Sequence, residues 1–309
     1  MNINDILKSI RKKDILSISR TITQIESSNC DKLLSEIYPF IGNAFRIGIT
    51  GPPGAGKSSI TNELITKYRG LNKSVAVIGV DPTSPFTGGA LLGDRLRMAK
   101  HFSDSGVYIR SMASRGSQGG LSHKSQDVGN ILDCAGFDII IYETVGVGQI
   151  ELDVMKSSDL VIVVLVPESG DDIQMMKAGL MEIGNIFVIN KSDRPGSDKL
   201  KTSMQQIFSL KNNIESWENP IIKTSIIENF GLDDLFEHTN NYYYYYKESG
   251  LKNVILKDRY KQQIEEMITR ELQMKFWNKK RKSFLDAIFK KDQKDWPSPV
   301  KLLKKIKSK

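Results

Sequence analysis

Apolar residues along this chain fall into short continuous runs that alternate with longer amphipathic stretches. The runs are rich in Ile and Val and lack polar alternation, which is typical of strands buried on both faces of a parallel sheet. They are Arg46–Thr50, Val75–Asp81, Val107–Ser111, Asp138–Glu143, Leu160–Val166, Ile186–Asn190 and Ile221–Ser225. Helix-like segments separate most of them. The pattern therefore predicts an α/β domain over residues 44–246, with a doubly wound, mostly parallel sheet.

The two ends of the chain show helical spacing instead. Residues 1–43 return isoleucine at near-helical intervals and are predicted to be an N-terminal helical extension. Residues 247–309 carry an apolar stripe formed by Tyr260, Ile264, Met267, Ile268, Leu272 and Phe276, repeated by Phe284, Leu285, Ile288 and Phe289. Such a stripe must pack on the domain or on another chain. The run Tyr242–Tyr246 is interpreted as a helix end with partly exposed rings.

Composition leaves a soluble globular protein as the default. The hydrophobic fraction is 39% and the charged fraction is 26%, both ordinary for that class. No apolar run approaches the ~20 residues that span a bilayer, and the first residues lack a signal-peptide core. We therefore expect a cytoplasmic location. Cys30 and Cys134 are far apart and the three histidines are scattered, so no metal or redox spacing is visible.

The net charge of +8 is concentrated at the C-terminal end. Residues 247–309 contain 19 Lys and Arg against 8 Asp and Glu. A nucleic-acid or acidic-membrane partner is one interpretation. The positive residues are interleaved with apolar ones at helical spacing, however, which favours solvated helix faces. The expectation from sequence is that neither nucleic acid nor membrane is a partner.

A phosphate-binding loop is the clearest chemical motif. Gly51–Ser58 matches G-x-x-x-x-G-K-[ST], follows a predicted strand and opens a predicted helix. Its glycines let backbone N–H groups turn toward phosphates, and the helix N-terminus adds positive potential. Lys57 is expected to reach the β- and γ-phosphates and Ser58 to ligate Mg²⁺. The predicted nucleotide contacts here are Gly51, Pro52, Pro53, Gly54, Ala55, Gly56, Lys57, Ser58 and Ser59.

Carboxylates near the expected phosphates complete a predicted Mg²⁺ site. Glu143 and Asp81 each close a predicted strand, and Asp94 follows in a Gly-rich stretch. Carboxyl ends of parallel strands line the ligand crevice of an open α/β sheet, and Mg²⁺ prefers hard oxygen ligands. The predicted metal ligands are Ser58, Asp81, Asp94 and Glu143. Of these, Asp94 and Glu143 are also expected to act in catalysis beside Lys57.

A second motif predicts which base is bound. Asn190-Lys191-Ser192-Asp193 matches N-K-x-D directly after an apolar strand. The Asp193 carboxylate can accept hydrogen bonds from guanine N1–H and the exocyclic amino group, whereas adenine would leave it unpaired, a mismatch that discriminates strongly. Asn190 is expected to brace the loop, and the Lys191 stem to lie along the base. Thr224, Ser225 and Ile226, at the end of the last predicted strand, are expected to cover the base edge with a backbone N–H. Ser225, Ile226 and Ile227 are the predicted nucleotide contacts in this segment.

Two further loops have the composition of nucleotide-dependent switches. Gly146 lies in the Gly-rich segment after Glu143, where an amide could sense a γ-phosphate. Gly170–Lys177 follows another predicted strand, and within it Gln174 and Lys177 are candidate catalytic residues. Loops that the γ-phosphate orders and hydrolysis releases are a common switch device. The alternative is that Gln174 and Lys177 are simply exposed helix residues.

These motifs together resemble the MeaB/ArgK family, the GTPases associated with methylmalonyl-CoA mutase. The resemblance is continuous from about residue 17 to 240 and fades in the C-terminal helices. The segments that carry it are Gly51–Ser59, Val80–Ser84, Thr87–Gly89 with Gly93-Asp94, Arg115–Ser117 with Gly119–Leu121, Glu143–Gln149, and Met181–Ile183 with Asn190-Lys191 and Asp193. The block Glu-Thr-Val-Gly-Val-Gly-Gln is highly specific for this family.

The resemblance implies a homodimeric GTPase that acts as a chaperone for an adenosylcobalamin-dependent methylmalonyl-CoA mutase or a related acyl-CoA mutase. In that family, GTP binding and hydrolysis gate cofactor loading and protect the mutase from inactivation. The resemblance further implies Mg²⁺ as cofactor, GTP as substrate and no cobalamin bound by this chain itself. It also implies that the loop around Gln174 and Lys177 communicates with the mutase, and that the C-terminal helices form a dimerisation arm.

The chain departs from the family pattern at several positions, which are Gln118, Ile150, Glu168-Ser169 and Ile226. None is a predicted phosphate or Mg²⁺ ligand, so the departures concern the partner interface. Three alternatives remain open at the level of sequence. They are a metallochaperone GTPase, a kinase-like phosphotransferase acting on a transport protein, and a nucleic-acid binder that uses the basic C-terminal segment.

Overall fold

The computed structural model describes residues 2–27, 30–82, 98–114, 120–144, 146, 155–168, 179–210 and 217–309. It describes the backbone alone for residues 81, 82, 113, 114, 120–123 and 210. The chain forms two compact units, Met1–Leu256 and Lys257–Lys309, and the boundary falls within one long helix. The domain boundaries predicted from sequence, after residues 43 and 246, stay predictions.

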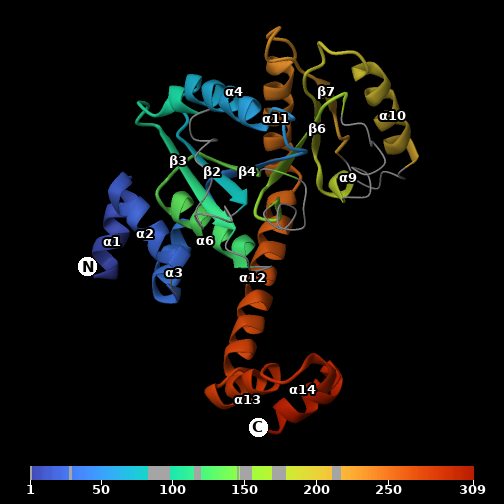
Figure 1. Cartoon of the computed structure of the whole chain (residues 1–309). Coiled ribbons are helices and arrows are strands. Elements are labelled where there is room, and N and C mark those ends of the chain that lie inside the picture. The colour runs from blue at the N-terminus through green and yellow to red at the C-terminus, as the bar shows by residue number, and fades with distance from the viewer. Residues whose placement is uncertain are drawn as a thin grey trace. The chain divides into compact units, whose positions relative to one another are not determined.

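A parallel sheet forms the centre of the first unit. The described residues contribute seven strands in the order β3-β2-β4-β1-β5-β6-β7, and every neighbouring pair is parallel (Figure 1). The strands are β1 (Phe45–Thr50), β2 (Val75–Pro82), β3 (Val107–Ser114), β4 (Ile139–Thr144), β5 (Leu160–Leu165), β6 (Ile186–Ile189) and β7 (Ile221–Lys223). All seven apolar runs are confirmed as strands, with ends that differ by one to three residues.

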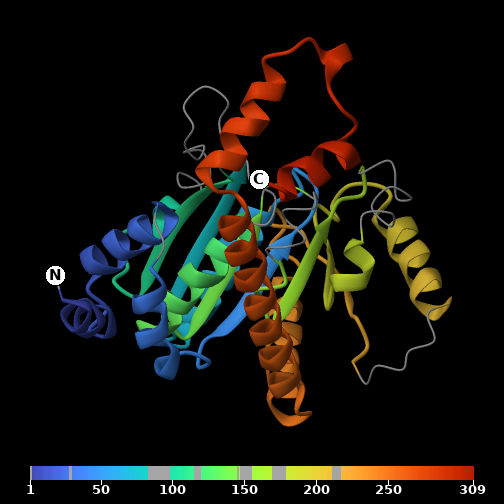
Figure 2. The same ribbon diagram turned by 90° about the horizontal axis from the view of Figure 1, so that it is seen from below.

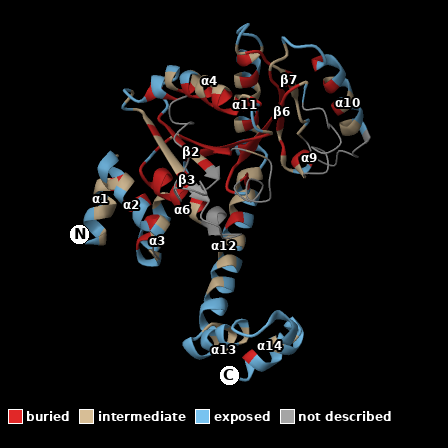
Figure 3. Ribbon diagram, viewed as in Figure 1, coloured by how far each residue is buried: buried red, intermediate tan, exposed pale blue. Residues whose placement is uncertain are grey.

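Helices cover both faces of this sheet, which confirms the doubly wound class. They are α1 (Ile3–Arg11), α2 (Ile15–Ser27), α3 (Asp31–Ile37), α4 (Lys57–Gly70), α6 (Gly120–Cys134), α9 (Leu180–Ile183), α10 (Ser197–Leu210) and α11 (Leu232–Glu248). Figure 1 shows α4 and α11 on one face and α6 on the other. In β4, Ile139 and Ile141 belong to the α4 and α11 core, whereas Ile140 and Tyr142 belong to the opposite one. Both faces are therefore buried, as Figure 3 shows.

The N-terminal helices α1, α2 and α3 pack against α6 (Figure 2). Isoleucines at helical spacing supply the contact, and Ile10, Ile18 and Ile22 are fully buried in the same core as the sheet. Burial of such side chains stabilises the fold by roughly 1.5–3 kcal/mol each. The predicted N-terminal extension is therefore helical, and its apolar face is covered by α6.

A buried ion pair fixes the start of the sheet to α6. The Arg46 guanidinium donates to Asp133 Oδ2 at 3.0 Å and to Asn130 Oδ1 at 2.9 Å, and Arg46 is only 2% exposed. The Asp133 carboxylate also accepts backbone N–H bonds from Gly42, Asn43 and Ala44. Asp133 therefore connects the N-terminal extension to the first strand.

The tyrosine run is largely a packing element. Tyr242 lies near the end of α11, is 2% exposed, and donates its hydroxyl to the Asp159 carbonyl at 3.1 Å. Its ring packs edge-on against the ring of Trp217, with the two ring centroids 4.9 Å apart. Tyr246 is also buried, whereas Tyr244 is 59% exposed. The interpretation as a helix end with partly exposed rings is correct. Tyr242 and Tyr246 are buried because residues i and i+4 share the face that packs on the sheet, whereas Tyr243 and Tyr245 are half-buried.

The second unit is helical, as predicted. Helix α12 (Leu251–Phe276) reaches into it from the first unit and is followed by α13 (Lys279–Phe289) and α14 (Pro299–Lys307). Asn278 caps α13, accepting a hydrogen bond from the Arg281 N–H. The predicted stripe residues Tyr260, Ile268 and Leu272 are at least half exposed, so this chain alone leaves much of the stripe uncovered.

Candidate functional site

The phosphate-binding loop connects β1 to α4 at the carboxyl edge of the sheet. Gly51, Gly54 and Gly56 all have positive φ, at 143°, 76° and 93°, in the region that favours glycine. A Cβ at Gly51 would lie 2.0 Å from the Val164 carbonyl oxygen, and one at Gly56 would lie 2.2 Å from Asn190 Nδ2. Two of the motif glycines are therefore required by close packing as well as by backbone conformation.

Lys57 and Ser58, the first residues of α4, are buried beneath the loop. Lys57 Nζ donates to the carbonyl oxygens of Gly51 at 2.7 Å and Pro52 at 2.9 Å. Ser58 Oγ donates to Glu143 Oε1 at 2.5 Å, from α4 to the end of β4. The structure thus brings together two of the four predicted metal ligands, which are 85 residues apart in sequence.

The N-K-x-D segment follows β6 and contacts the phosphate-binding loop directly. Asn190 is 2% exposed, and its Nδ2 donates to the Ala55 carbonyl at 2.8 Å. Its Oδ1 accepts a hydrogen bond from Thr224 Oγ1 at 3.1 Å. Lys191 adopts a left-handed backbone with φ of 57°, which turns the chain away from the strand. Asn190 therefore fastens three segments together, as its predicted bracing role requires.

Asp193 is held by the segment that follows β7. Ser225 Oγ donates to Asp193 Oδ1 at 2.6 Å and accepts from the Glu228 N–H at 3.2 Å. This hydroxyl is the main cause of the lowered pKa of Asp193, so the carboxylate is ionised at neutral pH. Asp193 is exposed, whereas Ser225 is fully buried. Water can therefore be removed from the Asp193 carboxylate only by a ligand that binds over it.

The remaining predicted base-edge residues differ in exposure. Ile226 is half-buried and packs against the α4 and α11 core, whereas Ile227 is 83% exposed. Both directly follow Ser225, on the same segment that holds Asp193.

Gly146 lies beside the ends of β1 and β4. Its carbonyl accepts hydrogen bonds from Thr50 Oγ1 at 3.2 Å and from Thr144 Oγ1 at 3.3 Å. Sequence reasoning did not single out Thr50 or Thr144, and it placed Thr224 only in the segment that covers the base edge. Each directly ends or follows a strand at the carboxyl edge, which is the signal that could have identified it.

The side chains of four other predicted site residues, Asp81, Asp94, Gln174 and Lys177, lie outside the described residues. Asp81 lies near the end of β2, paired in register with Ala113 of β3, but its side chain lies outside the described residues. Asp94, Gln174 and Lys177 also lie outside them. Among the described residues, no group of three or more His, Cys, Asp or Glu side chains could hold a metal ion.

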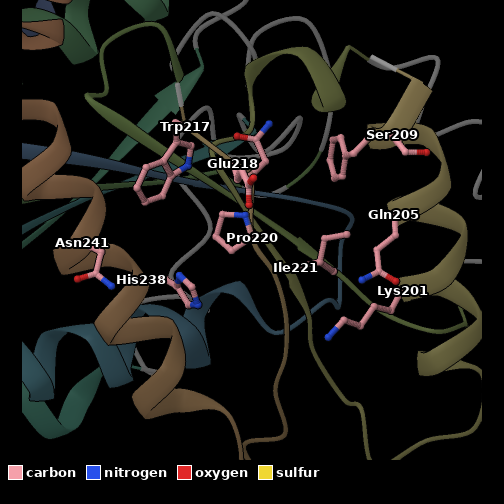
Figure 4. Close-up of a pocket in the computed structure, with 11 residues that line it drawn as sticks. Lys201, Gln205, Ser209, Trp217, Glu218, Pro220, Ile221, His238 and Asn241 are labelled. Carbon is pink, nitrogen blue, oxygen red and sulfur yellow. The ribbon is translucent and has the colours of Figure 1, made fainter. Parts of the chain in front are cut away.

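A cavity of about 700 Å³ lies away from this cluster, between α10, β7 and α11 (Figure 4). None of the motif residues lines it. Its lining residues are Lys201, Gln205, Phe208, Ser209, Trp217, Glu218, Asn219, Pro220, Ile221, His238 and Asn241. The lining mixes aromatic and polar side chains without a charged cluster, so it does not compete with the motif cluster as the candidate site.

Known proteins with similar sequences are named as GTPases. A protein of Pyrococcus horikoshii named as a GTPase is 48% identical over 255 residues, covering 80% of each chain. The GTPase ArgK of Escherichia coli is 33% identical over 256 residues, covering 79% of this chain and 77% of its own. The mitochondrial methylmalonic aciduria type A homolog of Caenorhabditis elegans is 32% identical over 272 residues, covering 81% and 68% respectively.

The fold also resembles a solved structure. A crystal structure of a LAO/AO transport system kinase superposes with a TM-score of 0.74 and 22% identity, covering 100% of this chain and 98% of that one. At this identity the likeness supports the fold alone. The family model described as methylmalonyl Co-A mutase-associated GTPase MeaB matches residues 18–281. With that match and these relatives, the chain belongs to the MeaB/ArgK family of P-loop GTPases and is an enzyme that hydrolyses GTP.

Proposed function

We propose that this chain is a Mg²⁺-dependent, guanine-specific GTPase that serves as a chaperone for an adenosylcobalamin-dependent methylmalonyl-CoA mutase. The observation that carries the nucleotide site is the bond from Asn190 to the Ala55 carbonyl. It joins the phosphate-binding loop to the base-reading loop. One nucleotide can therefore contact both motifs in a single cleft at the carboxyl edge of the sheet.

In this proposal the phosphates lie over the start of α4. The helix N-terminus and the backbone N–H groups of Gly51–Ser59 supply positive potential there. Lys57 Nζ donates to two loop carbonyls, and it would move to the β- and γ-phosphates, where the charge develops during hydrolysis. Lys57→Ala should therefore abolish turnover and weaken GTP binding.

Ser58 and Glu143 fit a Mg²⁺ site, because both are buried oxygen donors in direct contact and Mg²⁺ prefers such ligands. They would hold the ion directly or through water, with Asp81 and Asp94 as further predicted ligands. When bound, the ion would neutralise charge on the β- and γ-phosphate oxygens. Alanine at both Asp81 and Glu143 should slow turnover far more than twofold, and turnover within that limit would refute the metal assignment.

Guanine specificity rests on Asp193, whose carboxylate is ionised and fixed by Ser225. We expect calorimetry to show GTP and GDP binding with ATP far weaker. Asp193→Asn should shift preference toward xanthosine nucleotides, because an amide donates where a carboxylate can only accept. Asp234→Asn, an exposed change on α11, is the matched control. Comparable ATP and GTP affinities in the native protein would refute the guanine assignment.

The chaperone role is supported by the family description and by the name of the Caenorhabditis elegans relative. No residue in the described cluster is an obvious activator of water, so hydrolysis by the chain alone should be slow. A mutase that orders the loop containing Gln174 and Lys177 would complete the site and raise the rate. Each tenfold gain corresponds to ~1.4 kcal/mol of barrier.

The test is a GTPase assay with and without the mutase from the same organism. We expect stimulation that Gln174→Ala or Lys177→Ala reduces much more than GTP affinity. Gln206→Ala, an exposed change on α10, should leave the stimulation intact. Absence of both stimulation and a detectable complex in every nucleotide state would refute the chaperone role and leave the GTPase assignment standing.

Homodimer formation is supported by the α12 stripe. Met267, Ile268 and Leu272 are 45%, 50% and 62% exposed, and they recur on one helix face. An uncovered apolar face of this kind is typical of an interface. Light scattering should report a dimer, and Ile268→Asp should produce monomers whereas Gln273→Asp should not. A native monomer at micromolar concentration would refute the dimer.

The names of the relatives indicate GTPases. They give no support to the two alternatives of a metallochaperone GTPase and a kinase-like phosphotransferase. The solved structure that is named as a kinase is 22% identical to this chain, so its name carries no activity over to it. Incubation with labelled GTP and a candidate transport protein would reveal phosphotransfer directly. A metallochaperone role would require tight binding of nickel by the purified chain.

A further inference from the structure

The end of β4 directs two neighbouring side chains to opposite faces of the sheet, as successive residues of a strand do. Glu143 contacts Ser58 at the start of α4, on one face. Thr144 has the same parity as Tyr142, which lies in the core on the α6 face, and its hydroxyl oxygen is 3.3 Å from the Gly146 carbonyl oxygen. One strand end therefore carries a predicted metal ligand and a contact to Gly146, the residue predicted to meet the γ-phosphate.

Thr50 reaches the same carbonyl from the neighbouring strand. Ile49 of β1 pairs in register with Glu143 of β4, so the next residues of the two strands lie level at the carboxyl edge of the sheet. These residues are Thr50 and Thr144, and their hydroxyl oxygens are 3.2 Å apart. Thr50 Oγ1 is 3.2 Å from the Gly146 carbonyl oxygen. Thr50 is fully buried and Thr144 is 1% exposed, so two buried hydroxyls hold one backbone carbonyl.

Each threonine hydroxyl has one proton to donate. Among the described residues, the acceptor for Thr50 Oγ1 is the Gly146 carbonyl. Thr144 Oγ1 has three possible acceptors, which are Thr50 Oγ1 at 3.2 Å, the Gly146 carbonyl at 3.3 Å and the Ile49 carbonyl at 3.4 Å. A proton from Thr144 to Thr50 and one from Thr50 to Gly146 form a chain in which each bond polarises the next. Thr50 is thus the main donor to Gly146, and Thr144 supports it.

These bonds use the carbonyl of Gly146 and not its N–H. No described group accepts a hydrogen bond from that N–H. Thr50 directly precedes Gly51, the first residue of the phosphate-binding loop. The two hydroxyls therefore hold Gly146 beside the loop that is proposed to bind the phosphates. A donor whose position is already fixed loses less conformational entropy when it binds an oxygen.

The γ-phosphate is the group that GTP has and GDP lacks. Proposed contacts from Gly51–Ser59 and Asp193 are common to both nucleotides, so a change there would weaken both. A change that frees Gly146 should instead weaken GTP alone. If the threonines only stabilised the strand ends, GDP and GTP would lose affinity together or not at all.

We infer that Thr50 and Thr144 are positioning residues that set the preference of this chain for GTP over GDP, by fixing the Gly146 amide where it meets the γ-phosphate. Neither threonine touches the nucleotide in this arrangement, because both act through the Gly146 carbonyl. The inference rests on the proposed nucleotide site and on the predicted role of Gly146.

The test is calorimetry of the full chain with GDP and with GMP-PNP, a non-hydrolysable GTP analogue, in the presence of Mg²⁺. Thr50→Val keeps the shape of the side chain and removes the hydroxyl. The affinity for GMP-PNP relative to GDP should therefore fall about fivefold, the effect of one ordinary hydrogen bond. Thr144→Val should lower this ratio about twofold, because Thr50 can still donate to Gly146. The affinity for GDP itself should be nearly unchanged in both variants.

Two controls separate positioning from general structural support. Thr50→Ser keeps a hydroxyl at the same place and should keep the native ratio of affinities. Thr239→Val removes another fully buried threonine hydroxyl, which donates to the Leu235 carbonyl at 2.7 Å within α11. It should lower the free energy of unfolding without changing the ratio. Urea unfolding and circular dichroism check that each variant is folded.

Gly146→Pro removes the N–H itself and tests the role of Gly146 separately. It should lower the affinity for GMP-PNP relative to GDP at least as much as Thr50→Val does. If it lowers the ratio and both threonine variants leave the ratio unchanged, the inference is wrong and the role of Gly146 stands. If it leaves the ratio unchanged in a chain that still binds GDP, both are wrong.

Two other results would overturn the inference. An equal loss of GDP and GMP-PNP affinity in Thr50→Val would assign the threonines to structural support alone. Failure of the native chain to bind either nucleotide would refute the proposed nucleotide site and the inference with it.

Discussion

Replacing Asn190 by Ala should uncouple the two halves of the nucleotide site. The change removes the 2.8 Å bond to the Ala55 carbonyl and the 3.1 Å bond from the Thr224 hydroxyl. Both remaining groups belong to residues with no exposed surface. A buried polar group without a partner costs roughly 1–3 kcal/mol, so the expected loss of unfolding free energy is about 2–5 kcal/mol.

Nucleotide affinity should fall as well, because the phosphate-binding loop would have to be ordered by the ligand. Loss of two hydrogen bonds, each worth about 1 kcal/mol net, predicts weakening of at least ~10-fold, since 1.4 kcal/mol corresponds to tenfold. GDP and GTP should be affected alike, because neither base nor γ-phosphate contacts change. Urea unfolding and calorimetry with GDP measure the two quantities.

A second substitution, Thr224→Val, tests this explanation by whether it lowers or raises the stability of the protein in each background. Thr224→Val alone should destabilise the protein, because Asn190 loses a donor. In the Asn190→Ala background it should be neutral or stabilising, since it removes a buried hydroxyl that has already lost its acceptor. Asn241→Ala, an exposed change on α11, is the control. The reasoning is refuted if Asn190→Ala changes stability by under 1 kcal/mol and GDP affinity by less than twofold.

Three further outcomes are expected. The folded pKa of Asp193 is lowered, chiefly by the Ser225 hydroxyl, so GDP affinity should persist as pH falls through the usual pKa of an aspartate and decline only toward the lowered value. Ser225→Ala should move that decline to higher pH, and calorimetry from pH 3 to 7 detects it. Gly56→Ala should abolish GDP binding, because the new Cβ would lie 2.2 Å from Asn190 Nδ2 at a φ of 93°; retained affinity would contradict this. Asp133→Ala leaves a buried guanidinium unpaired, so it should cost about 3–5 kcal/mol in urea unfolding, with loss below 1 kcal/mol as the contrary result.

Local sequence patterns were enough to predict the helices and strands of this protein and the residue types expected in its nucleotide site. Buried parallel strands must be apolar on both faces, so runs such as Ile186–Ile189 are recognisable without knowledge of their neighbours. Local spacing likewise determined the motifs, because a phosphate-binding loop needs glycine, lysine and serine within eight residues. The helical ends were predicted for the same reason, since their periodicity is local.

Which of these residues are in contact depends on the tertiary structure. Asn190 and Ala55 are 135 residues apart, and Ser58 and Glu143 are 85 apart. Their contacts depend on the order of strands across the sheet, which places β4 beside β1, and β6 one strand further, after β5. Local periodicity carries no information about that order. The same holds for Tyr242, whose burial follows from how α11 packs on the sheet, because a helix turn shows only which residues share a face and not what covers them.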